Sequence, residues 1–223
     1  MSRTGGEERR RLLLAEAIRS FGVRGYRSTS LDGVADEIGV RKQTLLYYFP
    51  SKRKLFRACV DEFTASIGST LERALESRQK GWGRIEAVIR TVFELAEKRP
   101  ELLFFAQEAA RQTPGVVQRV AAALEPLRKR AIHFLERGME EGEFRRQDPA
   151  VVLFTLYTAV VGSLTEAAVW RVLAGAGARR MTLRTRQEEL IGFVHRALAR
   201  DRRARGSSGS QGVGKRAGRV FKR

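Results

Sequence analysis

Cysteine and histidine are scarce in this sequence of 223 residues, and asparagine does not occur at all. The single cysteine, Cys59, excludes a disulfide within the chain. One cysteine and two histidines are also too few for a zinc site of the usual Cys and His ligands. Without asparagine there is no acceptor for N-glycosylation. We therefore expect no disulfide framework, no metal site and no cofactor.

Long apolar runs are missing as well. None approaches the ~20 residues that a membrane-spanning helix needs, and the charged N-terminus is not followed by the apolar core of a signal peptide. We expect a cytoplasmic protein without a membrane partner. The apolar fraction of 43% is ordinary for a globular chain, and the length allows one or two domains with a substantial core.

Acidic residues are in short supply: 43 Lys and Arg stand against 25 Asp and Glu, which gives a net charge of +18. The excess lies at the two ends of the chain, whereas the middle two-thirds is nearly balanced. A coding bias toward arginine explains part of the excess but does not readily explain this segregation. The charge distribution favours a polyanionic partner, most plausibly nucleic acid.

Two short helices at a sharp angle are predicted within residues 29–49. Ser30 precedes an apolar-periodic run and is suited to cap the first helix. Val34 faces the core, and small Ala35 beside it lets a second helix approach closely. Gly39 then stands where a left-handed backbone ends a helix.

The second of these helices is predicted from about residue 41 to residue 48, with Leu45 and Phe49 pointing inward. Its other faces carry hydrogen-bond donors. Two helices joined by a short turn that contains glycine, the second rich in donors, describe a helix-turn-helix.

A longer set of residues extends this pattern: Phe21, Gly25-Tyr26, Ser30, Val34-Ala35, Ile38-Gly39-Val40, Thr44-Leu45, Tyr47, Phe49 and Ser51-Lys52. With this set, the stretch from Leu13 to about Phe56, roughly a fifth of the chain, resembles the DNA-binding domain of TetR-family transcriptional regulators. The family often has Ser, Gly, Tyr and His where this chain has Arg41, Gln43, Leu46 and Tyr48. These departures leave the expected fold intact, but different side chains at Arg41, Gln43 and Tyr48 could read different DNA.

The expected fold is all-α, with about nine helices. It comprises an N-terminal three-helix helix-turn-helix domain and a C-terminal helical domain for ligand binding and dimerisation. We expect four segments: a flexible arm at 1–6, the DNA-binding domain at 7–56, the helical domain at 57–203 and a disordered basic tail at 204–223. Apolar periodicity and caps predict helices at about 7–23, 84–99, 101–112, 114–141 (kinked or broken near Leu124 by Pro126), 149–173 and 183–203.

DNA contacts are predicted on the second helix of the pair and beside it. Near its start, Arg41 can bind guanine bidentately and Gln43 suits adenine. The resemblance implies phosphate contacts by Tyr47 and Lys52. The complete predicted set is Ser30, Arg41, Lys42, Gln43, Thr44, Tyr47, Tyr48 and Lys52. The alternative is a solvated polar face on two packed helices.

No enzyme signature stands out in the rest of the chain. Residues 209–215 only superficially fit a phosphate-binding loop, because neither Ser nor Thr follows Lys215. His133 and His195 lie on separate predicted helices, and Cys59 fits the apolar face of another, so it is interpreted as core. We expect no catalytic residues and no enzymatic activity.

Aromatic and polar side chains alternate in the C-terminal part, as a small-molecule pocket requires. The same aromatics could simply form the core, but the resemblance implies an inducer in this domain. The residues predicted to line a pocket are Phe93, Phe104, Gln107, Glu108, Arg111, Phe134, Arg137 and Tyr157. We expect an apolar or aromatic ligand rather than a sugar.

A homodimer is predicted from small residues on one C-terminal helix and an apolar face on the last. The residues proposed for the interface are Gly162, Ser163, Ala167, Phe193 and Val194. The same pattern could belong to packing within one subunit, and the resemblance favours the dimer.

The sequence thus predicts a repressor of transcription that binds palindromic double-stranded DNA as a dimer and is released by an unidentified small molecule. The alternative is an architectural or weakly specific DNA-binding protein driven by its basic ends.

Overall fold

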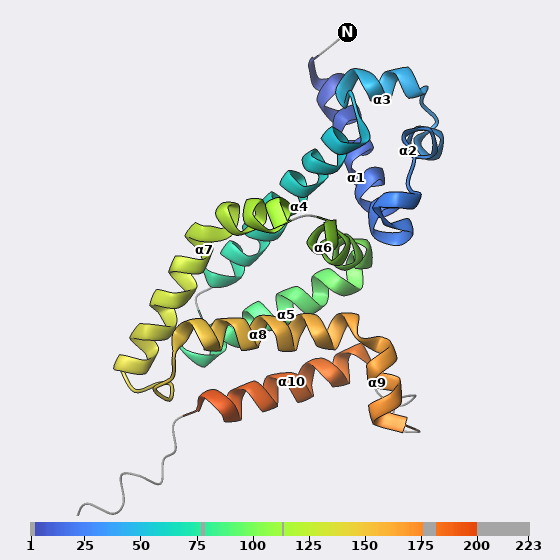
Figure 1. Ribbon diagram of the computed structural model, residues 1–223. Helices are drawn as coiled ribbons and strands as arrows, with labels where there is room; N and C mark the ends of the chain where they lie inside the picture. Colours follow the sequence, from blue (N-terminus) through green and yellow to red (C-terminus); the bar gives the residue numbers. More distant parts are fainter. Residues whose placement is uncertain (1–2, 77–78, 113, 176–181, 200–223) are drawn as a thin grey trace, which may run out of the picture.

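The computed structural model describes residues 3–76, 79–112, 114–175 and 182–199 (Figure 1). Within these residues the chain forms ten α-helices and no strand beyond one isolated bridge between Phe144 and Ala199. The helices are α1 (Arg3–Ser28), α2 (Leu31–Ile38), α3 (Lys42–Tyr48), α4 (Lys52–Leu75), α5 (Trp82–Lys98), α6 (Pro100–Gln112), α7 (Pro114–Glu140), α8 (Pro149–Thr165), α9 (Ala167–Ala174) and α10 (Leu183–Leu198). The all-α prediction is confirmed. None of these ten helices is long and apolar enough to cross a bilayer.

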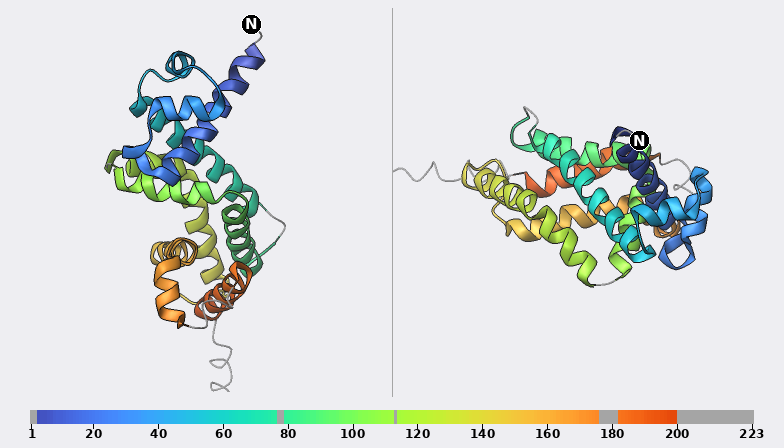
Figure 2. Two further views of the ribbon diagram at one scale, coloured as in Figure 1. Left: turned by 90° about the vertical axis from the view of Figure 1, so that its right-hand side faces the viewer. Right: turned by 90° about the horizontal axis from the view of Figure 1, so that it is seen from above.

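The helices divide between two ends of an elongated molecule (Figures 1 and 2). Helices α1, α2 and α3 form one end, which we call the head, while α5 and α7 to α10 form the other end, the body. Helix α4 starts in the head and runs into the body, where it packs against α5 and α7. One continuous helix therefore connects the two ends.

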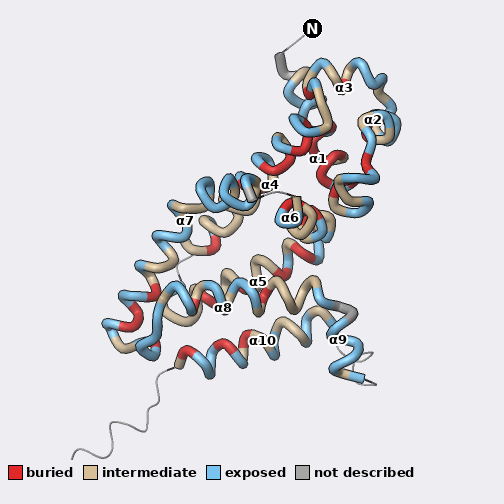
Figure 3. The backbone as a smooth tube through the Cα atoms, viewed as in Figure 1, coloured by how far each residue is buried: buried red, intermediate tan, exposed pale blue. Residues whose placement is uncertain are grey.

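Two apolar cores correspond to these ends (Figure 3). The body core is built from α5, α7, α8 and α10 together with Phe144. The head core contains α1, α2, α3 and the first half of α4, but it also contains Leu102, Phe105 and Ala109 of α6. The Phe105 ring lies 5.5 Å from that of Phe56, so α6 belongs to the head by packing although it lies far along the chain.

Helix α1 differs from its prediction at both ends. It begins at Arg3, inside the segment expected to be a flexible arm, and it resumes after Gly25 to end at Ser28. Gly25 has a φ of 80° and a ψ of 160°, so the predicted end near this glycine appears as a kink. Residues 1–2 and the expected tail at 204–223 lie outside the described residues.

Two predictions for the body need correction. The helix expected at 149–173 is two helices, because Glu166 has non-helical angles (φ −91°, ψ 47°) between α8 and α9. The apolar pattern continues across this residue, so periodicity gave no sign of the break. Helix α7 runs through Pro126 without ending, so the break, one of the two outcomes expected near Leu124, does not occur; proline removes one helical N–H and the flanking turns remain.

Helix α1 approaches α6 very closely at Gly22. A Cβ built on this glycine would lie 2.8 Å from the carbonyl oxygen of Glu101 and 2.9 Å from the backbone nitrogen of Phe105. Those atoms belong to backbone and cannot rotate away. The distance between the two helices therefore depends on the absence of a side chain at this position.

We predict that Gly22→Ala destabilises the protein by about 2 kcal/mol, because the added methyl group must push α6 away from α1. Gly5 lies in the same helix, and a Cβ there would meet nothing within 4 Å. Gly5→Ala should therefore be neutral or slightly stabilising, since alanine is the better helix former. Urea denaturation of both variants measures the difference. A Gly22→Ala variant as stable as the parent would contradict the close packing.

Candidate nucleic-acid interface

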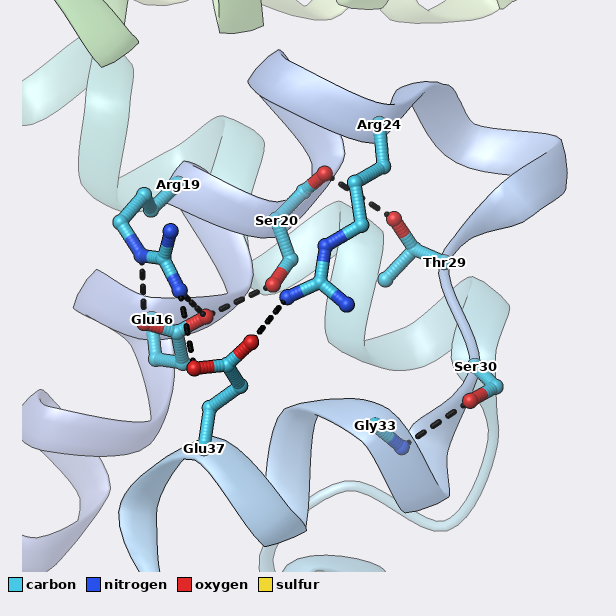
Figure 4. A network of polar contacts seen from close by, with 8 residues as sticks. All are labelled: Glu16, Arg19, Ser20, Arg24, Thr29, Ser30, Gly33 and Glu37. Atoms are coloured by element: carbon cyan, nitrogen blue, oxygen red, sulfur yellow. Dashed lines mark hydrogen bonds and ion pairs between the residues drawn. The ribbon is translucent and has the colours of Figure 1, made fainter.

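A polar network attaches α2 to α1 (Figure 4). Glu37 of α2 pairs with two arginines of α1, at 2.5 Å from Arg24 and 3.3 Å from Arg19. Beneath it the buried hydroxyl of Thr29 donates to the carbonyl oxygen of Ser20, at 3.0 Å. Exposed ion pairs contribute little each, so the buried hydroxyl is the firmer anchor.

The predicted turn chemistry of the helix pair is confirmed. The backbone N–H of Gly33 donates to the Ser30 hydroxyl at 3.0 Å, which caps α2. Gly39 adopts the left-handed conformation with a φ of 70°. The N–H of Val40 then donates to the carbonyl of Ala35, at 3.0 Å, and closes the end of the helix.

Helix α3 is held by its inward face. Leu45 is fully buried and Phe49 nearly so, as the sequence predicted. Arg41, Gln43 and Tyr47 lie on the outer faces and are exposed, Tyr47 to 82%. Hydrogen-bond donors are therefore presented to solvent from a helix whose opposite side is fixed in the core.

The other predicted DNA contacts are less free. Lys42 forms an ion pair of 2.8 Å with Asp32 of α2. Thr44 and Tyr48 are half-buried, and the Tyr48 ring lies 5.1 Å from that of Tyr47 in an edge-to-face arrangement. Ser30 keeps an exposed hydroxyl, but that hydroxyl already caps α2.

The Lys52 side chain makes contacts within the head. Its ammonium group donates to the carbonyl oxygen of Arg27 at 3.1 Å and lies 4.6 Å from the centre of the Tyr26 ring. Partial burial lowers the pKa of Lys52 below its usual value. An ammonium group has three N–H donors, so one bond to Arg27 leaves others for a phosphate.

Sequence reasoning missed a cluster of arginines at the start of α1. Arg9, Arg10 and Arg11 are all exposed, and the Arg10 guanidinium lies 5.4 Å from the centre of the Phe49 ring, at the end of α3. Three successive arginines were the available signal. They were overlooked because they fall in a helix assigned only to packing.

The residues predicted to line a ligand pocket do not come together. A cavity of about 230 Å³ lies between α4, α5, α7 and α8, and among those residues only Phe134 and Tyr157 line it. Phe93 is buried in the body core outside the lining, and Arg137 is exposed and pairs with Glu141. The others, Phe104, Gln107, Glu108 and Arg111, lie on α6.

Glu108 has a different place from the one expected. Its carboxylate accepts a hydrogen bond from the backbone N–H of Tyr26, at 2.7 Å, and another from the Gln112 side chain, at 2.6 Å. It therefore caps the chain after the kink at Gly25 and ties α6 to α1. The lining residues that the sequence did not suggest include Leu71 and Val88, whose apolar periodicity indicated only a core, and Arg84 at the start of α5.

The residues predicted for a dimer interface differ in how far they are buried. Phe193 is 62% exposed, whereas Val194 beside it is 4% exposed and belongs to the body core. Gly162 and Ser163 are half-buried, and Ala167 is the first residue of α9. Exposed apolar side chains that the sequence analysis did not select lie nearby on α8 and α9: Val151, Phe154, Val169, Val172 and Leu173.

Cys59 is fully buried in the head core, and burial raises the pKa of its thiol far above the usual value. The thiolate is the reactive form, so this cysteine is inert in the folded protein. No group of three or more His, Cys, Asp or Glu side chains suited to a metal ion occurs among the described residues.

We predict that Lys52→Met lowers the free energy of unfolding by about 1 kcal/mol, because it removes the bond to Arg27 and the contact with Tyr26. Gln43→Ala, at an exposed position of the neighbouring α3, should change the free energy of unfolding by less than about 0.5 kcal/mol. Chemical denaturation followed by circular dichroism compares the two. If the two variants are equally stable, Lys52 does not make stabilising contacts with Arg27 and Tyr26 in solution.

Comparison with known proteins gives consistent matches. The family model of bacterial regulatory proteins, tetR family, matches residues 13–59. The nucleoid occlusion factor SlmA of Haemophilus influenzae (strain PittGG) is 27% identical over 169 residues, which covers 72% of this chain and 75% of that protein. The structure of the ketosteroid transcriptional regulator KstR2 of Mycobacterium tuberculosis superposes with a TM-score of 0.67 at 20% identity, covering 90% of this chain and 98% of that one. A crystal structure of AibR in complex with isovaleryl coenzyme A and operator DNA superposes with a TM-score of 0.66 at 19% identity, covering 82% and 96%.

Proposed function

The chain belongs to the TetR family of bacterial regulatory proteins and is a DNA-binding transcriptional regulator, and from that premise we propose that it acts as a ligand-released dimeric repressor. The observation that carries the proposal is the outer face of α3, where Arg41, Gln43 and Tyr47 are exposed over an inner face fixed by Leu45 and Phe49.

Within this interface, we assign Arg41 and Gln43 to base edges and Tyr47 to the phosphate backbone. The first two stand at the start of α3, the end that enters the major groove in a helix-turn-helix. Lys52 joins Tyr47 through the N–H donors that its bond to Arg27 leaves over. Base contacts set sequence preference, whereas phosphate contacts add affinity for any duplex.

Dimerisation through α8, α9 and α10 is supported by apolar surface left open on these helices. Phe154, Val172 and Phe193 are each more than half exposed. In a hollow between the same helices, the Trp170 Nε1–H and the Arg186 Nε–H are buried and have no hydrogen-bond acceptor within the described ranges. A second subunit seated here would cover the apolar groups and could supply acceptors. Two heads could then engage half-sites ~34–36 Å apart on one side of the duplex.

Release by a small molecule follows from the course of α4. The helix starts at Lys52 in the head, and its Leu71 and Leu75 line the cavity in the body. A ligand there changes the position of α4 and thus the spacing of the two heads. It can do so only by as much as its affinity differs between the two arrangements. AibR, a protein of similar fold, forms a complex with isovaleryl coenzyme A and operator DNA, so this fold can bind both kinds of partner.

Two other functions have less support. An architectural DNA-binding protein driven by its basic ends would not need the exposed face on α3, and deletion of the residues after Arg203 should then abolish binding. We expect that deletion to change operator affinity little. Enzymatic activity lacks a paired acid and base, a nucleophile with its base, or a metal cluster among the residues that the structure describes.

The experiment that tests the function is selection of bound sequences from a random duplex library by the full-length protein at physiological salt. We predict enrichment of a palindrome, because non-specific binding is weak under these conditions. Gln43→Ala should shift the recovered sequence, whereas Tyr47→Ala should weaken binding to operator and scrambled duplexes alike. If the protein retains duplex DNA without enriching any sequence, and loses it as the salt concentration rises, the architectural function would be favoured over the repressor.

The dimer has its own test. We predict that Phe193→Asp produces monomers and lowers operator affinity at least tenfold, because a charge on a buried apolar contact opposes association. Val117→Asp places the same charge on an exposed apolar position of α7 and serves as the control. Sedimentation and operator binding are measured on both. If Phe193→Asp remains dimeric, the α10 face is not the interface.

A further inference from the structure

We propose that the body cavity binds an anionic amphiphile, an apolar chain with a carboxylate or phosphate head, and that Arg84 binds the head group. This inference rests on the proposed ligand response and adds the chemical class of the ligand. It comes from the contrast between an apolar wall and one arginine whose Nε–H has no acceptor among the residues that the structure describes.

The wall of the cavity is almost entirely hydrocarbon. Arg84 is the only charged residue in the lining, and Tyr157 is the only other polar one, among the part of the chain that the structure describes. The remaining lining residues are Leu71, Leu75, Ile85, Val88, Ile89, Val92, Ala131, Phe134, Leu135, Leu153, Leu156, Val160 and Val161. Such a wall favours a ligand with a large apolar part and offers little to a sugar or another polar molecule.

The cavity extends along one side of α5. Arg84, Val88 and Val92 recur at intervals of four residues, so they share a face of this helix, and all three line the cavity. At ~1.5 Å per residue, Arg84 and Val92 are about 12 Å apart along the helix axis. The charged group therefore stands at one end of an elongated apolar wall. A chain with its charge at one terminus matches this arrangement better than a molecule with charge at its centre.

Arg84 lines the cavity mainly with the carbon atoms of its side chain, so its guanidinium has to turn toward the cavity to meet a head group. Its guanidinium lies 5.1 Å from the centre of the Phe134 ring, which also lines the cavity. Its Nε–H is buried and has no hydrogen-bond acceptor among the described residues. Arg90 on the same helix differs sharply, because it bonds to the carboxylates of Glu86 and Glu188 at 2.8 Å each.

A buried donor without an acceptor is costly, and the cost is recovered when a ligand supplies the acceptor. A carboxylate or phosphate does so with a charge-assisted bond, about twice as strong as a neutral one, and fits the planar guanidinium. A neutral apolar ligand would fill the same wall but would leave the Arg84 Nε–H unpaired. We therefore expect the negative charge of the ligand to increase affinity only through its bond to Arg84.

Calorimetric titration of the full-length protein with decanoate, decyl phosphate and decan-1-ol tests the inference. We expect an anion to bind ~10- to 100-fold more tightly than the alcohol, as a hydrogen bond to a charged group predicts. Whether decanoate or decyl phosphate binds more tightly distinguishes the two head groups. Shortening the chain by one methylene should weaken binding roughly fourfold while the chain lies within the wall.

Variants locate the effect. Arg84→Met should bring the affinity for both anions down to that for the alcohol and leave the alcohol unchanged, because the apolar wall is retained. Arg84→Lys should recover part of the preference. Arg128→Met removes the same charge from an exposed position of α7, where Arg128 pairs only with Glu125 among the described residues, and should change nothing.

The outcomes of these experiments distinguish a failure of this inference from a failure of the proposed function. If the alcohol binds as tightly as both anions and also releases operator DNA, the ligand response stands and the anionic class is wrong. If Arg84→Met keeps the anion preference, Arg84 is not the anchor. If none of the three probes binds, the proposal of an amphiphilic ligand is wrong. Operator binding measured in the same samples then tests the proposed function as a DNA-binding regulator independently.

Discussion

The close contact between α1 and α6 attaches the head to the rest of the structure. Gly22 lets the two backbones approach until no side chain fits between them, and Phe105 packs from α6 against Phe56 in the head core. Glu108 adds a hydrogen bond to the backbone of Tyr26 just past the kink. The orientation of α2 and α3, and hence of the exposed face of α3, depends on this support because α2 packs on α1 and α3 packs on α2.

Local features of the head could be predicted from sequence because neighbouring residues determine them. Ser30 caps α2, Gly39 supplies the left-handed turn, and Leu45 and Phe49 face inward as their spacing indicated. The partnership of Glu108 with Tyr26 joins residues 82 positions apart, and no periodicity reports such a contact. The role of Lys52 in the fold was hidden for the same reason, since its partners lie 25 residues away in the sequence.

The candidate pocket shows a second limit of pattern reasoning. Aromatic side chains interleaved with polar ones suggested α6, but α6 buries Phe105 against α1 and leaves Phe104 partly exposed, so the pattern encloses no pocket there. The cavity instead lies where α4, α5, α7 and α8 leave space between aliphatic side chains. Residues that line a void and residues that fill a core have the same periodicity, because both face inward.

The head core also has a consequence for the unit that folds. Cutting the chain after the sequence-defined DNA-binding domain would strip Leu102, Phe105 and Ala109 from the apolar cluster that includes Phe21 and Phe56. The predicted boundary near residue 56 therefore divides an apolar core that the head shares with α6. Because the head and α6 share one core, we expect them to unfold together and α6 to move with α2 and α3 relative to the body.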